Sequence, residues 1–181
     1  MSVCSPALFL LLSVVVVVVV VGFASPIQPF FLSFSTLHTH TVYNTHTHTH
    51  TLKKKPSIHS AYALVLSGNH VYTSGAGGTH AATIRGALRA EDPELLTVVL
   101  PQSLAKQPAE SQQLLENVEG LIEMPQNDDK TLDVASRICN SYLVNQTDQM
   151  IAFAFHESST VLEATREARE QNKPVTTLFL D

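Results

Sequence analysis

From Ile58 onward, short apolar runs alternate along the chain with stretches that mix apolar and polar residues at helical spacing. A continuous apolar run indicates a strand buried on both faces, and an amphipathic stretch indicates a helix. The pattern predicts strands at 71–73, 95–100, 121–124, 150–155 and 175–180, and helices at 58–66, 79–90, 108–117, 131–142 and 159–171. This alternation predicts an α/β fold, a Rossmann-like mostly parallel sheet with helices on both faces.

Three local signals refine these elements. Gly68 stands where the C′ residue of the first helix is expected, because glycine adopts the left-handed conformation that ends many helices. Pro108 stands at the start of the third helix, where a missing N–H has little cost. In the fourth helix the spacing predicts four inward side chains, those of Leu132, Ala135, Ile138 and Cys139.

Residues 1–57 follow a different pattern. Ala7 to Ala24 is an uncharged, mostly apolar run followed by Ser25-Pro26, as in a signal peptide or a short membrane anchor. No Lys or Arg precedes this run, and eight consecutive valines are unusual in either kind of segment, because valine is a poor helix former. We expect a leader or anchor-like segment at 1–25, a low-complexity Thr/His-rich linker at 26–57 and one domain at 58–181.

The linker contains five of the nine histidines, at positions 38, 40, 46, 48 and 50. In an extended chain His46, His48 and His50 share one face and could chelate a transition metal. A Thr-His alternation is also what a dinucleotide repeat encodes, and no neighbouring residue supplies a second shell. We expect no metal site here.

Charge and cysteine content restrict the partners of the domain. From Ser60 onward, eight Lys and Arg face sixteen Asp and Glu, a balance of −8. This balance disfavours a long polyanion such as single-stranded DNA, whose binding depends on clustered cations. Cys139 is the single cysteine of the domain, so an intradomain disulfide is excluded and a reducing compartment is favoured.

The stretch from Thr73 to Leu88, TSGAGGTHAATIRGAL, contains four of the seven glycines and lies between a predicted strand and a predicted helix. A glycine-rich turn into a helix presents backbone N–H groups to an anion at the carboxyl end of a strand. Glycines allow close approach, and hydroxyls can donate hydrogen bonds. The predicted phosphate ligands are Ser74, Gly75, Gly77, Gly78, Thr79 and Arg85. A tight structural turn is the alternative, because the spacing is neither GxGxxG nor GxxxxGK[ST].

The segment SGAGGTHAATIRGAL resembles the SGxxxGIDxxAHxGAL element of the DNA recombination-mediator protein A family, also called DNA-processing protein A, within the SLOG group of nucleotide-binding domains. The matching residues are Ser74, Gly75, Gly78, Ala82, Gly86, Ala87 and Leu88. The loop is one residue shorter, and His80 replaces the family's Asp. Residues 58–181 as a whole are similar to a cyanobacterial and plant-plastid branch of the group.

The resemblance implies a nucleotide or other small phosphate-bearing ligand, no known cofactor, and a plastid or cytoplasmic location unless the leader directs the chain to a membrane or the secretory pathway. His80, Arg137, Asn140 and His156 are the predicted supporting residues. His156 and Glu157 follow the predicted strand 150–155 and are candidates for acid–base chemistry. A polar helix entrance with a serine N-cap is the alternative. The sequence leaves open whether the chain forms a homo-oligomer.

Two other functions remain alternatives. The first is a single-stranded DNA-binding recombination mediator, for which Arg85, Arg89 and Arg137 would begin a basic groove. The second is a nucleoside-monophosphate phosphoribohydrolase, since related enzymes carry a PGGxGTxxE element at the second loop. FHESSTVLEA lacks those glycines, so Glu163 is a displaced counterpart at best, and we expect binding rather than catalysis.

The family's first central strand ends in a Gly-Ser-Arg-type loop, and no such loop precedes Ile58. Residues 27–37 are apolar enough for a strand but lack an anion-binding end. Loss of a central strand would expose apolar surface and unpaired backbone groups. We therefore expect a chain that lacks the family's first strand, with residues 1–57 as an acquired or mis-assigned segment.

Overall fold

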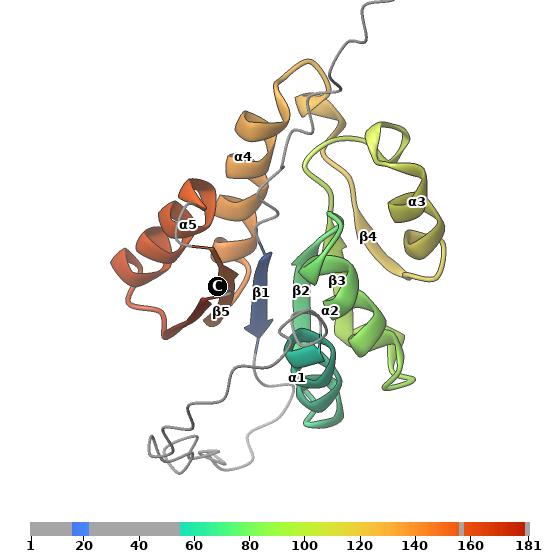
Figure 1. Ribbon diagram of the computed structural model, residues 1–181, viewed down its shortest axis with the longest axis vertical. Coiled ribbons are helices and arrows are strands. Elements are labelled where there is room, and N and C mark those ends of the chain that lie inside the picture. Colours follow the sequence, from blue (N-terminus) through green and yellow to red (C-terminus); the bar gives the residue numbers. More distant parts are fainter. Residues whose placement is uncertain (1–15, 22–54, 156–157, 180–181) are drawn as a thin grey trace, which may run out of the picture.

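The computed structural model describes residues 16–21, 55–155 and 158–179, and Figure 1 shows their arrangement. Five of its strands are β2 (His70–Ser74), β3 (Leu96–Val99), β4 (Gly120–Ile122), β5 (Gln149–Ala154) and β6 (Val175–Phe179). The helices are α1 (Lys55–Leu66), α2 (Thr79–Leu88), α3 (Ala109–Leu115), α4 (Leu132–Asn145) and α5 (Ser159–Glu170). Three short 3₁₀ turns lie at Pro93–Leu95, Leu104–Lys106 and Pro125–Asn127.

The strands form one six-stranded sheet in the order β4-β3-β2-β1-β5-β6. β1 (Val16–Val21) runs antiparallel to both of its neighbours, β2 and β5. All the other pairs are parallel, so β2 to β6 point the same way and their carboxyl ends share one edge of the sheet. The predicted α/β class and mostly parallel sheet are confirmed.

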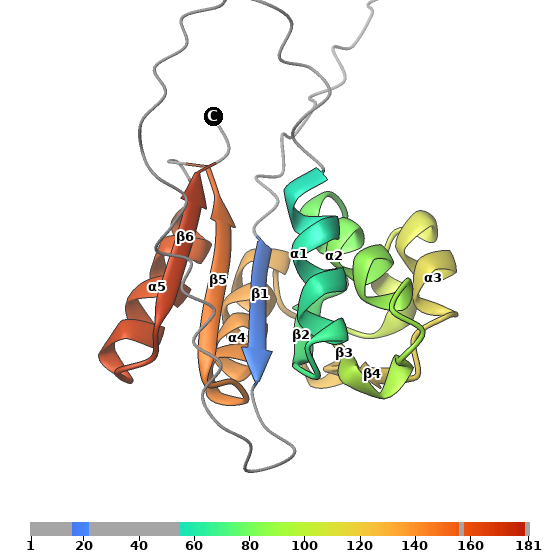
Figure 2. The same cartoon turned by 90° about the horizontal axis from the view of Figure 1, so that it is seen from below.

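Helices cover both faces of the sheet (Figure 2). On one face, Ala61 of α1, Ile84 of α2 and Leu115 of α3 pack with Val71 and Val98 of the sheet. On the other face, Cys139 and Leu143 of α4 and Val161 and Ala164 of α5 pack against Ala152. Because β2 continues toward β3 through α2 while β5 continues toward β6 through α5, the chain diverges from the middle of the sheet. In doubly wound folds this divergence marks the ligand crevice.

The predicted first-helix cap is present. Gly68 has φ 76°, its N–H donates to Val65 O at 2.8 Å, and Asn69 N–H donates to Leu64 O at 3.0 Å. These two bonds are those of a Schellman motif, which satisfies the last carbonyls of the helix. The short loop then leads directly into β2.

Two of the four predicted inward positions of α4 are wrong. Ala135 and Cys139 are buried, but Leu132 is 44% exposed and Ile138 is 38% exposed. The face against the sheet follows the spacing Ala135, Cys139 and Leu143, and Ile138 lies to one side of that row. Leu132 is the first residue of the helix and lies beyond the edge of the core.

The central position of the sheet contains a strand from the valine run, although the sequence predicted that this position would be empty. Val16 to Val20 pair with Phe153 to Gln149 of β5, and Val19 to Val21 pair with Tyr72 to His70 of β2. The remainder of Ala7–Ala24, the segment 27–37 and the histidine-rich linker lie outside the described residues.

Candidate functional site

The glycine-rich loop lies at the carboxyl end of β2, beside the diverging point of the sheet. β2 ends at Ser74 and α2 begins at Thr79, so four residues make the whole connection. Gly78 is the N-cap residue with φ 71°, and its carbonyl accepts from Ala82 N–H at 3.1 Å. Among the described residues no side chain caps α2, and its first turn contains no acidic residue. The positive end of the helix dipole therefore faces the loop, and the first turn of the helix places no carboxylate against it.

The glycines of this region have different physical roles. A Cβ at Gly75 would overlap Leu100 Cδ2, and a Cβ at Gly86 would overlap the backbone carbonyl of Ile58 in α1. Both glycines are therefore required by packing. Gly77 is exposed and a Cβ there would meet no atom within 4 Å, so its missing side chain leaves room for a group from outside.

The two hydroxyls of the predicted phosphate site are both buried, with Ser74 7% and Thr79 9% exposed. The Ser74 side chain hydrogen-bonds the Cys139 thiol, whose Sγ also lies 3.5 Å from Val99 O. Burial raises the pKa of Cys139 to about 12, and the bond from Ser74 opposes this only in part. Ser74 therefore connects β2 to α4, and the loop side of the site depends on Gly77, Gly78 and Thr79.

His80, in the first turn of α2, is buried, with 2% exposure. Its Nδ1 lies 3.0 Å from Thr73 Oγ1 at the end of β2. The pair joins the strand before the loop to the first turn of the helix after it. His80 thus lies beneath the loop, and its role toward a ligand stays a prediction.

The predicted supporting cations both have carboxylate partners. Arg85 Nη2 lies 3.7 Å from Glu110 Oε1. Arg137 Nε lies 3.2 Å from Asp133 Oδ2, and Arg137 Nη1 hydrogen-bonds Glu163 Oε2. The hydrogen bonds that Arg137 donates to Glu163 and Asp133 raise its pKa above the usual value.

Of the other two predicted supporting residues, Asn140 belongs to the described part of the chain and His156 does not. Asn140 is buried on α4 at 6% exposure, one residue from Cys139. His156 and its neighbour Glu157 lie outside the described residues. Next to them, Phe155 N–H donates to Ser158 Oγ at 3.2 Å and Ser158 N–H donates to Phe155 O at 3.0 Å. Ser158 occupies the N-cap position of α5, but its side chain makes no capping hydrogen bond to that helix.

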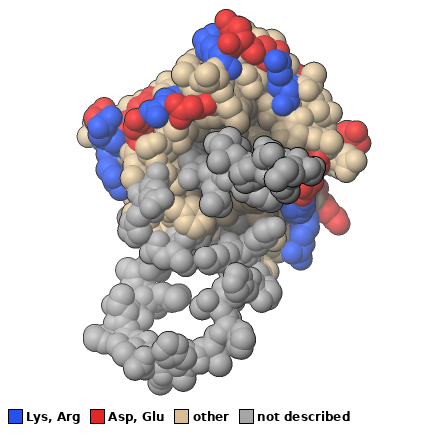
Figure 3. All heavy atoms as spheres, turned by 45° about the horizontal axis from the view of Figure 1, so that its top comes forward, with Lys and Arg blue, Asp and Glu red and all other residues tan. Residues whose placement is uncertain are grey.

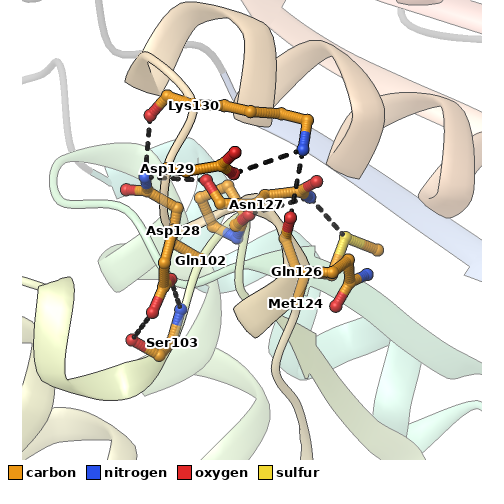
Figure 4. Close-up of polar contacts among 9 residues, drawn as sticks. Gln102, Ser103, Met124, Gln126, Asn127, Asp128, Asp129 and Lys130 are labelled. Carbon is orange, nitrogen blue, oxygen red and sulfur yellow. Dashed lines mark hydrogen bonds and ion pairs between the residues drawn. The ribbon is translucent and has the colours of Figure 1, made fainter.

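A polar cluster that sequence reasoning missed follows β3 and β4 at the same sheet edge (Figure 4). Asp128 accepts at 2.7 Å from both the N–H and the hydroxyl of Ser103. Gln102 Nε2 donates to the carbonyls of Asn127 and Lys130, and Asn127 Nδ2 donates to Pro101 O. These bonds from Ser103 hold the pKa of Asp128 below its usual value. The segment PQS before a 3₁₀ turn and the segment PQNDDK were the available signals, since such residues favour side-chain to backbone bonds.

This cluster fixes the wall beside the glycine loop. Ser74 pairs with Val99 in the parallel ladder, so the chain leaving β3 at Leu100 and Pro101 passes next to Gly75. Asn127 and Gln102 are buried and tie that chain to the turn after β4. The glycine loop is therefore bounded on the β3 side by a fixed polar turn.

Charged side chains on the surface near this edge alternate in sign. Figure 3 shows Lys and Arg beside Asp and Glu around the rim of the visible face, with no continuous basic stripe among the described residues drawn there. Within the described part of the chain there is no group of three or more potential metal ligands among His, Cys, Asp and Glu. In those same residues no helix is long and apolar enough to cross a membrane.

Comparison with protein-family models, with curated proteins and with solved structures finds no match for this chain.

Proposed function

We propose that this chain is a nucleotide- or phosphate-binding Rossmann-like domain, resembling the DNA recombination-mediator protein A family, in which Gly77, Gly78 and Thr79 receive the phosphate. One observation carries the proposal: an open glycine turn leads from the carboxyl end of β2 into an α2 helix whose first turn has no acidic residue. Backbone N–H groups and the helix dipole favour an anion at such a turn.

The same geometry favours a small ligand. The turn offers three residues of backbone, and Arg85 and Arg137 each have a carboxylate as ion-pair partner. With a balance of −8 from Ser60 onward, a long polyanion would meet net repulsion. A mononucleotide requires only the local field of the turn.

Glu163 supports binding over N-glycosidic cleavage. A catalytic carboxylate of that kind must reach the sugar, whereas Glu163 is engaged by Arg137 on the neighbouring helix. We therefore expect no release of free base when the protein is incubated with AMP or another nucleoside monophosphate. Release of base and ribose phosphate at a rate that depends on Glu163 would favour the enzyme instead.

The proposal is tested by ligand-dependent thermal stabilisation. A ligand present at 100 times its dissociation constant adds about 2.7 kcal/mol to the free energy of unfolding, which for a domain of this size raises Tm by roughly 5–10 °C. AMP and inorganic phosphate are the probes, and adenosine is the control without phosphate. We expect AMP to raise Tm and adenosine to have little effect.

Two substitutions at one position separate charge from shape. Gly77→Ala adds a methyl group into open space, and Gly77→Asp adds a carboxylate where the phosphate would lie. Stabilisation by AMP should persist in Gly77→Ala at a reduced level and disappear in Gly77→Asp. Equal stabilisation of the wild type and Gly77→Asp by AMP would exclude this loop as the site.

A further inference from the structure

β6 forms one end of the sheet, and no strand of the described residues lies beyond it. Its inner edge bonds β5, where Met150 N–H donates to Pro174 O at 2.9 Å. In a parallel ladder, alternate residues of a strand bond the same neighbour. Because Met150 is in register with Val175, the backbone groups of Thr176 also point toward β5. The N–H and C=O of Val175 and Thr177 therefore point to the outer edge.

The two ends of the sheet differ in their protection against further pairing. At the other end, β4 has three residues and lies between the exposed carboxylates Glu119 and Glu123. Short strands and flanking charges discourage the addition of a strand. β6 has five residues, VTTLF, none of them charged, and Leu178 and Phe179 are 41% and 47% exposed. An uncharged edge with exposed apolar side chains is a template for another strand.

The middle residue of β6 has a buried hydroxyl without a partner. Thr177 Oγ1 is buried and makes no hydrogen bond within the part of the chain that the structure describes. Val175, two residues earlier, packs with the core under α4 and α5, so Thr177 faces the same side of the sheet. A change of χ1 rotamer turns the hydroxyl to the outer edge, where a threonine on a neighbouring strand would bond it.

We propose that the outer edge of β6 binds β6 of a second copy of this chain, antiparallel, about a two-fold axis between the two Thr177 residues. In this register each Thr177 exchanges both backbone hydrogen bonds with the other. Val175 lies opposite Phe179 of the second copy, and Thr176 lies opposite Leu178. The two sheets become continuous, with α4 and α5 of both copies on one face. This inference rests on the edge of the sheet and does not depend on the proposed function.

A second copy fits this edge better than an unrelated strand. A two-fold axis makes two identical strands antiparallel, and the outward backbone groups at alternate positions then meet their counterparts. The contact covers both exposed apolar side chains, and a threonine at the central position supplies a hydroxyl to Thr177. A stable interface uses roughly 20–30 residues a side, and this edge offers five residues. We therefore expect a reversible dimer that forms at high protein concentration.

Single cysteines test the register in a Cys4→Ser background of the full chain. Two copies of Thr177→Cys would face each other as a hydrogen-bonded pair, with Cα atoms about 5.5 Å apart, which suits a disulfide. Thr176→Cys is the matched control, because position 176 is the more exposed of the two but lies opposite position 178 of the second copy. The Cys4→Ser parent controls for Cys139, and far-ultraviolet circular dichroism checks folding.

The expected result is at least tenfold more covalent dimer from Thr177→Cys than from Thr176→Cys, as measured by mass spectrometry of the intact protein after mild oxidation. Equal crosslinking of the two variants would show random collision and overturn the proposal. The absence of covalent dimer from Thr177→Cys would also overturn it.

Sedimentation equilibrium tests the dimer without a covalent bond. The wild type should show a monomer–dimer equilibrium. Thr177→Pro removes an outward N–H and no bond to β5, so it should raise the dissociation constant at least tenfold. If Thr177→Pro does not fold, Thr176→Lys places a charge on the exposed edge and should have the same effect. A wild type that is monomeric at all concentrations, a wild type that forms open-ended larger species, or an unchanged dissociation constant in the folded variant would overturn the proposal.

Discussion

Thr73 Oγ1 lies 3.0 Å from His80 Nδ1, so the end of β2 and the first turn of α2 are joined beneath the glycine loop by a buried hydrogen bond. Loss of one partner leaves the other buried without this bond, which costs about 1–3 kcal/mol. We predict that Thr73→Val and His80→Phe each lower the free energy of unfolding by an amount in this range, measured by urea denaturation.

The double variant separates this bond from the other interactions of His80. The double variant should lose about 1 kcal/mol less free energy of unfolding than the sum of the losses in the two single variants, because that sum counts the interaction between the two residues twice. Strict additivity would mean that the bond contributes nothing to the loop.

Gly75 and Leu100 define a second close relationship at this loop. A Cβ at position 75 would overlap Leu100 Cδ2, and Leu100 is fully buried. We predict that Gly75→Ala destabilises the domain by about 1–3 kcal/mol through overpacking. Gly77→Ala is the matched control, expected to change stability by less than about 0.5 kcal/mol, because it projects into open space. Equal losses of stability in the two variants, measured by thermal unfolding, would contradict this account.

Because of Cys139, the free energy of unfolding should depend on pH in the alkaline range. Burial raises its pKa to about 12, above that of a thiol in the unfolded chain, so the folded state disfavours the thiolate. The contribution of the neutral Cys139 thiol to the free energy of unfolding is complete below about pH 9 and is lost as pH rises toward 12. We predict that the wild type loses more stability over this window than Cys139→Ala, measured by urea denaturation at several pH values. Parallel curves for the two proteins would contradict this assignment.

Asp128 has the opposite pH dependence. Hydrogen bonds from Ser103 lower its pKa, so its contribution is present above about pH 4 and is lost as pH falls further. We predict that Asp128→Asn is less stable than the wild type at pH 7 and that the difference shrinks in acid. Ser103→Ala should reproduce the effect in part, since it removes the hydroxyl and keeps the backbone N–H. A difference that does not change with pH would exclude the ionised carboxylate as the cause.

The sequence predicted the regular elements of the domain to within a few residues, because apolar strands and helices with clear ends follow local rules. Gly68 and the runs at 95–100 and 150–155 are examples. The burial of Leu132 and Ile138 was wrong because helical spacing gives a face but not the tilt of the helix on the sheet. The valine run was not recognised as a strand, since a homopolymer has no period from which to choose between strand and leader.

The candidate site was less accessible to sequence reasoning. The glycines were identified, but the packing roles of Gly75 and Gly86 depend on Leu100 and Ile58, which are distant in sequence. The link between Ser74 and Cys139 and the bonds between Ser103 and Asp128 depend on the sheet bringing separate loops together. No local pattern contains that information.

Backbone amide shifts measured by NMR test the central claim most directly. In a titration of the ¹⁵N-labelled full chain with AMP, the largest and saturable changes should fall on Gly77, Gly78 and Thr79, with smaller ones along the first turn of α2. Adenosine should leave these amides nearly unchanged, and Gly77→Asp should abolish the response. Saturable changes centred elsewhere, for example at the start of α5, or the absence of any change at millimolar AMP, would contradict the account.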